Sequence, residues 1–428
     1  MAARPGCTVN DASSAGASRA QVCFCAYRRS DTTTSVWGQA VDFELSDAQQ
    51  AVRVQARTLA ARFDNAYWRS CDAEHRFPWE FYQAFADAGW LGIAIPPEYG
   101  GAGLGITEAS LLLEEVAASG AAMNGATALH LTIFGLNPVV RHGSEELKRR
   151  VLPEAAAGRL HVAFGVTEPD AGSDTPSITT RAERRGDRFF ISGKKVWTSK
   201  AKESSKVLLL ARTTSLAESP RRTDGMTLFL ANLDPRHVTI REIEKLGRHA
   251  VDSNEVFYDD LLVDARDVVG TVDRGFYHLL DGLNPERILI AAEALGTGRA
   301  ALRAATAYAK QRVVFGRPIG QNQGIQFPLA DSYAKLQAAE LLVRKAAWLY
   351  DRGLPCGAEA NTAKYLASEW GFEAADRALQ TLGGFGYARE FDVERYWREV
   401  RVMRIAPVTQ EMVLNFLAQH ELGLPRSY

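Results

Sequence analysis

A strand followed by a polar loop is the stretch of the sequence best suited to bind a small molecule. The run from Phe164 to Asp174 begins with apolar and β-branched residues and continues with Thr, Glu, Pro, Gly, Ser and Asp. Backbone amides and hydroxyl groups in such a loop could hold a polar heterocycle or a phosphate. On composition alone, a purely structural turn is the favoured interpretation of the same residues.

Other local patterns do not indicate a catalytic or metal site. The eight histidines are scattered singly, and no Ser/His/Asp or Cys/His arrangement has a recognisable local context. Cys23 and Cys25 have no second pair at zinc-ligand spacing, so no metal site is predicted. The Gly-rich run at 100–105 lacks the Lys-Ser/Thr of a phosphate loop and is predicted to join two helices.

The composition favours a small-molecule or protein partner. With 428 residues, the chain exceeds one comfortable hydrophobic core, so two or three units are expected. The 50 basic and 51 acidic residues give a formal net charge of −1, which does not favour binding to nucleic acid or anionic lipid. No run approaches the roughly 20 apolar residues of a membrane span, and five cysteines form no disulfide framework. We expect a soluble, cytoplasmic protein.

Residues 1–41 differ from the rest of the chain. They are rich in Ala, Ser, Thr and Arg, poor in acidic residues and without apolar periodicity, so we predict a disordered extension. Two interpretations stay open. The extension could be a transit peptide that directs the protein to the mitochondrial matrix, or translation could start at Val41.

The periodicity of apolar residues divides the remaining chain into three parts. Residues 42–160 are predicted to be all-helical, with a capping box at Ser46 and Gln49 and an N-cap at Ser144. Residues 161–270 alternate at β spacing, with a hairpin turn at 185–187, and indicate a small barrel or sandwich. Helical spacing returns in residues 271–428 and predicts an antiparallel four-helix bundle. The fold class is therefore α+β multidomain.

The predicted elements have the following bounds. Helices are expected at 46–63, 79–88, 106–118, 144–157, 275–311, 323–352, 356–382 and 393–420. Strands are expected at 161–167, 188–197, 206–212, 226–232, 238–243 and 256–262.

The polar loop also carries a family resemblance. Thr167-Glu168-Pro169-Asp170-Ala171-Gly172-Ser173-Asp174 resembles the signature of the acyl-CoA dehydrogenase family, whose members have the same order of helical, β and helical domains. Further matching pieces follow in the family's order and cover residues 42–428. They are Lys195-Val196-Trp197-Thr198-Ser199, the strand from Leu246-Gly247 to Asp260, Gln311-Arg312-Val313-Val314-Phe315-Gly316, Gln323 and Gln380-Thr381-Leu382-Gly383-Gly384-Phe385-Gly386.

The resemblance implies an FAD cofactor and assigns residues to it. Val166 and Thr167 would hydrogen-bond the pyrimidine side of the flavin, Trp197 would cover one ring face, and the Ser199 hydroxyl would reach N5. Arg312 would bind the pyrophosphate, while Gln323, Gln380, Gly383 and Gly384 would hold the adenosine end from a neighbouring subunit, which implies a homodimer or homotetramer. The complete set of expected cofactor residues is Phe164, Val166, Thr167, Ser173, Trp197, Ser199, Arg312, Phe315, Gln323, Gln380, Gly383, Gly384 and Thr409.

The resemblance also implies a catalytic carboxylate. Many family members place this base near the C-terminus, but Pro407 stands at that position here. The isovaleryl and long-chain types place it directly before an Arg on the first bundle helix, where this sequence has Glu286 and Arg287. Glu286 is therefore the expected base, and Ser173, Asn284 and Arg287 are the expected substrate-binding residues. Two neighbouring positions, His249 and Val251, depart from the family's usual Arg and Ser.

The implied reaction converts an acyl-CoA to a trans-2-enoyl-CoA and passes electrons to an electron-transfer flavoprotein. Two alternatives stay open. The reduced flavin could react with oxygen, as in oxidases and monooxygenases of similar fold. The chain could also be a non-catalytic flavin-binding scaffold, because Pro407 replaces the usual base. The acyl chain itself is not predicted.

Overall fold

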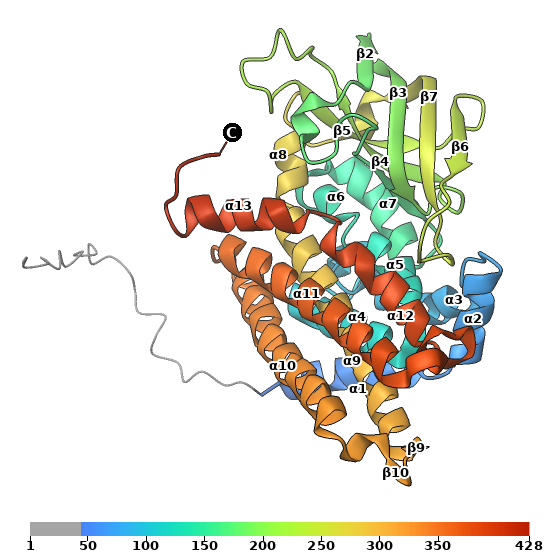
Figure 1. The fold of residues 1–428 in the computed structure, drawn as a ribbon. Coiled ribbons are helices and arrows are strands. Elements are labelled where there is room, and N and C mark those ends of the chain that lie inside the picture. Colours follow the sequence, from blue (N-terminus) through green and yellow to red (C-terminus); the bar gives the residue numbers. More distant parts are fainter. Residues whose placement is uncertain (1–43, 428) are drawn as a thin grey trace, which may run out of the picture. The chain divides into compact units, whose positions relative to one another are not determined.

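The computed structural model describes residues 44–427, within one compact unit that begins at Leu45 (Figure 1). The extension predicted at residues 1–41 lies outside the described residues. The order of helices, strands and helices confirms the predicted α+β class. Within the described residues, no helix is long and apolar enough to cross a membrane.

Seven α-helices form the first part. Both predicted N-caps are confirmed: Gln49 N donates to Ser46 Oγ at 3.3 Å, and Leu147 N donates to Ser144 Oγ at 3.2 Å. The Gly-rich run at 100–105 is a loop before the fourth helix, as predicted. The helices are α1 (Asp47–Ala60), α2 (Asn65–Ala73), α3 (Trp79–Asp87), α4 (Ile106–Val116), α5 (Ala122–Ile133), α6 (Asn137–His142) and α7 (Glu145–Ala156).

Within the described residues, eight strands form one mixed sheet with the order β6-β7-β3-β2-β4-β5-β8, in which β1 pairs in parallel with β4. Two short strands, β9 (Val313–Val314) and β10 (Arg317–Pro318), form a separate antiparallel pair. The β2–β3 hairpin turns at Gly186, whose φ is +67°, which confirms the predicted turn. Strands β2 and β8 of this sheet were not predicted, nor were β9 and β10. The strands are β1 (Val162–Gly165), β2 (Arg181–Arg185), β3 (Arg188–Ser199), β4 (Lys206–Arg212), β5 (Met226–Asn232), β6 (Val238–Glu242), β7 (Ser253–Asp264) and β8 (Val268–Val269).

The sheet buries both faces of its central strands. Along β4, Val207 and Leu209 belong to a core shared with β3 and β7, while Leu208 and Leu210 belong to a core shared with α7. A strand that is buried on both faces has a continuous apolar sequence, which explains why β4 and β5 were predicted with correct bounds. One face of the β part therefore packs on the first helical part.

The last part contains six α-helices, and the structure corrects two of the predicted ones. The predicted helix 275–311 is interrupted at Asp281–Gly282, and the predicted helix 393–420 ends at Val400 and restarts at Gln410. Pro407 lies in the second interruption, and proline cannot donate the hydrogen bond that a continuous helix needs. The helices are α8 (Gly275–Leu280), α9 (Leu283–Gln311), α10 (Gln323–Asp351), α11 (Gly357–Leu382), α12 (Val393–Val400) and α13 (Gln410–His420).

Helix α9 lies at the centre of the helical parts (Figure 1). It packs against α4 of the first part and against α10 and α11 of the last part, and one hydrophobic core joins all of these helices. With 29 residues it is about 44 Å long. Helix α9 is therefore packed against both helical parts.

Candidate functional site

The polar loop after β1 is held by a buried ion pair. Lys195 Nζ on β3 lies 2.8 Å from Glu168 Oε1 and also donates to Val166 O at 2.8 Å. Both charged side chains are buried, and Val196 N donates to Thr167 O at 2.9 Å. The backbone of Val166 and Thr167, the two residues expected at the flavin, is thus fixed against β3.

Glu168 is ionised despite its burial. Burial by itself raises the pKa of this carboxyl, but the charge of Lys195 and hydrogen bonds from Thr179 and Thr180 lower it to about 2. Glu168 and Lys195 occur within the motifs that match the family, but they were not predicted to be functional residues. Their contact depends on the packing of the loop after β1 against β3, which a single sequence does not reveal.

Trp197 and Ser199 lie at the end of β3, beside an irregularity in its pairing with β7. The register shifts between Lys195 and Thr198, Trp197 has a φ of +60°, and its side chain is 57% exposed. Such bulges redirect side chains next to binding sites. The Trp197 indole is therefore available to cover a planar ring, as the flavin assignment requires.

The Ser199 hydroxyl has an unexpected neighbour. Arg248 Nη2 lies 3.3 Å from Ser199 Oγ and 3.3 Å from Ser253 Oγ. Arg248 has a left-handed backbone with a φ of +58°, which is uncommon for a residue with a side chain and often marks a functional constraint. Sequence reasoning missed this residue, since an isolated Arg in a loop carries no distinctive signal.

The loop that contains Arg248 is held by His249 and Val251, which replace the family's usual Arg and Ser. The His249 ring stacks on His75 with a centroid distance of 4.7 Å, and hydrogen bonding to Asp72 raises the pKa of His249. Val251 is fully buried in the helical core. His249 and Val251, the two residues that depart from the family pattern, therefore attach this loop to the first helical part.

Phe164 and Ser173 take different positions around the loop. Phe164 is half-buried, and its ring lies 5.8 Å from that of Phe134, which directly follows α5. Ser173 is exposed, and the next residue, Asp174, forms a 2.7 Å ion pair with Arg222. An exposed hydroxyl beside this pair suits a charged, solvent-facing part of a ligand.

Glu286 is a buried carboxyl in the first turn of α9. It is 7% exposed, and burial together with the charge of Glu293 raises its pKa to about 8, although the charge of Arg287 acts in the opposite direction. Arg287 Nη1 donates to Asn284 Oδ1 at 3.1 Å. Pro285 does not bend α9, because it lies in the first turn, where no helical N–H is needed. A buried carboxyl of this kind is suited to take a proton from carbon.

Several of the remaining predicted cofactor residues, Arg312 and Phe315 among them, follow the opposite end of α9. Arg312 follows Glu286 by 26 residues, which is about 39 Å along the helix (Figure 1). Arg312, Gly383 and Gly384 line one cavity of about 730 Å³, whose wall also includes Phe385. Phe315 is 100% exposed. One chain therefore contains two separate groups of the predicted residues. The first group comprises Val166, Thr167, Trp197 and Ser199, and the second comprises Arg312, Gly383 and Gly384.

Gln380 and Gln323 lie beside the second group, whereas Thr409 lies apart from it. Gly383 N donates to Gln380 O, and Gln323 directly follows Asn322, which lines the same cavity. Gln323 is the first residue of α10, Gln380 lies near the end of α11, and both are exposed. The Thr409 hydroxyl caps α13 by accepting from Met412 N at 3.3 Å. The buried Lys364 donates to Val408 O at 2.6 Å and holds the turn before this cap.

The features of both groups fit FAD. The first group offers an exposed indole and fixed backbone groups, and the second offers an arginine that forms no ion pair within residues 44–427. A Cβ atom added at Gly383 or Gly384 would meet no heavy atom within 4 Å, so a large ligand group has room there. A long dinucleotide with a planar ring at one end and phosphates in its middle matches these features.

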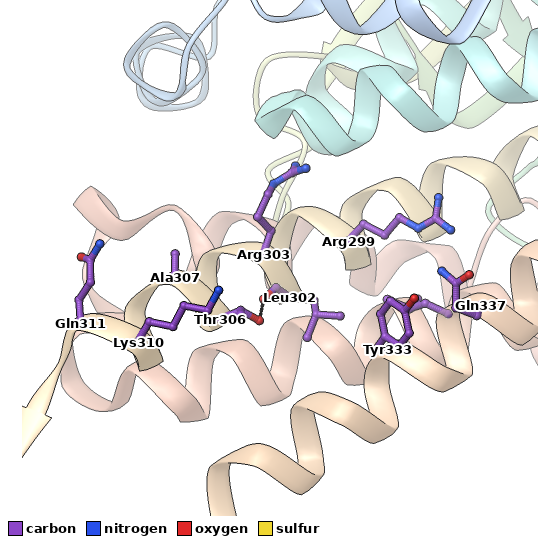
Figure 2. A pocket seen from close by; sticks show the side chains of 10 residues that line it. Arg299, Leu302, Arg303, Thr306, Ala307, Lys310, Gln311, Tyr333 and Gln337 are labelled. Atoms are coloured by element: carbon purple, nitrogen blue, oxygen red, sulfur yellow. Dashed lines mark hydrogen bonds between the residues drawn. The ribbon is translucent and has the colours of Figure 1, made fainter. Parts of the chain in front are cut away.

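A further hollow, between α9 and α10, contains none of the predicted residues. It measures about 500 Å³, and Figure 2 shows its basic and polar side chains, among them Arg299, Arg303 and Lys310. Its position on the outer side of α9 separates it from the loop and from Glu286. We assign it no role in the site.

Comparisons with known proteins agree with this geometry. The acyl-CoA dehydrogenase N-terminal, middle and C-terminal domains match residues 46–159, 163–261 and 273–422. The acyl-CoA dehydrogenase FadE12 of Mycobacterium tuberculosis is 39% identical over 388 residues, covering 90% of this chain and 98% of its own.

Two solved structures are also similar. Butyryl-CoA dehydrogenase from Megasphaera elsdenii has a TM-score of 0.83 at 29% identity, covering 87% of this chain and 98% of its own. A structure titled for the electron transferring flavoprotein of Acidaminococcus fermentans contains a chain with a TM-score of 0.83 at 30% identity, covering 89% of this chain and 100% of its own. The match of all three domains in order shows that this chain belongs to the acyl-CoA dehydrogenase family, whose members are FAD-binding oxidoreductases.

Proposed function

We propose that the protein oxidises an acyl-CoA thioester to the trans-2-enoyl-CoA, with Glu286 as the base. The observation that carries the proposal is the buried carboxyl of Glu286 on a rigid helix, with Pro407 at the position where many relatives place the base. This placement corresponds to the isovaleryl and long-chain types of the family. It also explains how the chain could be an enzyme without the usual C-terminal glutamate.

Each of the following residues of this chain would have its own role in the reaction. Glu286 takes the proton from the α carbon, and Asn284 and Arg287 orient the thioester at the start of α9. When bound, FAD supplies the acceptor for the hydride that leaves the β carbon. Val166, Thr167, Trp197 and Ser199 orient the ring, while closure of the site around the substrate excludes water.

A second copy of the chain would complete the cofactor site. Arg312 lies about 39 Å along α9 from Glu286, and Gly383 lines the same cavity as Arg312, so the two groups of one chain serve different sites. We propose that Arg312, Phe315, Gln323, Gln380, Gly383 and Gly384 of one copy hold the adenosine and phosphate part of the FAD whose ring lies in another. The assembly would be a homodimer or homotetramer.

We propose an electron-transfer flavoprotein as the acceptor of the electrons. The similarity to a chain in the Acidaminococcus structure supports this choice over oxygen. The relatives reported above come from bacteria, which supports a bacterial cytoplasmic enzyme over the mitochondrial alternative.

An anaerobic bleaching screen tests the function. Purified protein with FAD is mixed with straight, branched, long and ring-bearing acyl-CoAs, and the oxidised flavin absorbance is followed. We expect bleaching by at least one substrate class, and faster reoxidation by an electron-transfer flavoprotein than by oxygen. Faster reoxidation by oxygen would favour an oxidase. Protein that retains FAD but is bleached by none of the acyl-CoAs would be a scaffold.

The pKa of Glu286 predicts the pH dependence of the reaction. The free base must be ionised, and its pKa is raised to about 8, so kcat/KM should rise with pH through this value and level off above it. The measurement is a kcat/KM profile from about pH 6 to about pH 10. A profile that is flat, or that falls over this range, would contradict the role of Glu286.

A further inference from the structure

A group of buried polar atoms between α5 and α9 has unused hydrogen-bonding capacity. Glu293 is fully buried, and its Oε1 lies 2.7 Å from His130 Nδ1, while its Oε2 has no partner within the described residues. Thr127 lies one turn before His130 on α5, and its buried hydroxyl also has no partner there. Buried polar atoms without partners are costly, so such a pair indicates a missing ligand or ordered water.

Arg248 adds a hydrogen-bond donor to this group. Its recorded contacts are the two neutral hydroxyls of Ser199 and Ser253, and it forms no ion pair within residues 44–427. The charges of Glu293, Glu399 and Asp252 nevertheless act on the buried Arg248 guanidinium. The strained backbone of Arg248 holds this donor in place.

The position of the group relates it to the proposed reaction. Glu293 follows Glu286 by seven residues, so both side chains lie on nearly the same face of α9, about 10 Å apart along its axis. Arg248 contacts Ser199, the residue expected at flavin N5. A substrate placed between Glu286 and the flavin would therefore extend toward Glu293, Thr127 and Arg248.

We propose that these residues form the distal end of the acyl-binding site and select an acyl-CoA that carries a hydroxyl group remote from the thioester. A hydroxyl can donate to Glu293 Oε2 and accept from Arg248 at the same time. A carboxylate would place a second negative charge beside Glu293, and a methyl group would leave the polar atoms unpaired. The inference rests on the proposed function, because it takes Glu286 as the position of the α carbon.

Binding to the Glu286→Gln protein with FAD bound tests the inference without any turnover. A series of ω-hydroxyacyl-CoAs is titrated against the unsubstituted acyl-CoAs of equal length, with dicarboxylic analogues as a third arm. We expect one chain length at which the hydroxyl tightens binding about tenfold, since one hydrogen bond to a charged group has this magnitude. Equal affinity at every length would mean that the group holds only water, and stronger binding of the carboxylate would also overturn the proposal.

Substitutions identify the residues responsible. In the Glu286→Gln background, Thr127→Val and Glu293→Met should each reduce the preference for the hydroxyl, and Thr127→Val changes the shape of the site very little. Thr132→Val is the matched control, because Thr132 lies buried on the same helix with its hydroxyl 3.2 Å from Tyr82 Oη. An unchanged preference in both test variants would contradict the assignment. Bleaching of the unaltered protein reports on the proposed function separately.

Discussion

Replacing Glu286 by Gln is expected to slow anaerobic flavin reduction by an accepted acyl-CoA by about 10²–10⁴-fold, the range typical of a positioned general base. Glutamine keeps the size and polarity of the side chain but cannot take the proton from the α carbon. The measurement is the rate of bleaching in a stopped-flow instrument at saturating substrate. FAD content and the absorption spectrum should not change, because Glu286 is not among the residues expected to contact the flavin.

The control is a second buried glutamate outside the site. Glu115 is 7% exposed and pairs with Arg53 and Arg57 of α1, so Glu115→Gln should leave the rate of bleaching close to that of the unaltered protein. If Glu286→Gln is reduced at the full rate, another group removes the proton and the base assignment is wrong. If both variants are slow, the loss reflects structure rather than chemistry.

Replacing Lys195 by Met is expected to destabilise the protein by about 3–5 kcal/mol, because it leaves the buried carboxylate of Glu168 without its cation. The variant also loses the hydrogen bond to Val166 O, so weaker FAD binding should accompany the loss of stability. Denaturant unfolding followed by circular dichroism measures the first effect, and fluorescence of released flavin measures the second.

The exposed pair of Lys202 and Glu242 offers a matched control. Surface ion pairs contribute about 0–1 kcal/mol, so Lys202→Met should change the denaturation midpoint very little.

The pKa of Glu168 is lowered to about 2 in the folded protein, so the stabilisation that this carboxylate provides is complete above its ordinary pKa of 4.5 and is lost as the pH falls toward 2. Lys195→Met should weaken this acid dependence. Identical acid unfolding of variant and parent would show that the pair does not stabilise the loop.

Local patterns explain how much of the fold could be predicted. β4 and β5 were predicted with correct bounds because they are continuous apolar runs. The start of α1 was predicted because its capping box is local, although the helix ends at Ala60 and not at Phe63. β2 was missed because Ala182 is its only buried residue, so the strand shows no apolar alternation. The interruption at 401–409 was missed because helical spacing continues on both sides of it.

The same difference between local motifs and residues far apart in the chain applies to the candidate site. The loop at 164–174 is contiguous, so its motif can be recognised in the sequence, and the family comparison confirms the family that this motif implied. His130 and Glu293 are 163 residues apart, and neither stands in a motif, so nothing local indicates that they form a buried pair. The same holds for Arg248, whose contact with Ser199 depends on the pairing of β3 with β7.

The sequence by itself determined the family, the order of helical and β parts and the residues expected around an FAD, since these are carried by contiguous motifs and short-range periodicity. Only the tertiary structure decided that Glu286 is buried, that most of the predicted cofactor residues lie in two groups near opposite ends of α9, and that Glu293 Oε2 and the Thr127 hydroxyl are buried without a partner in the described residues. The physical reason is that proton affinity and hydrogen-bond satisfaction depend on the dielectric surroundings and partners of each group. Those surroundings are assembled from residues far apart in the chain.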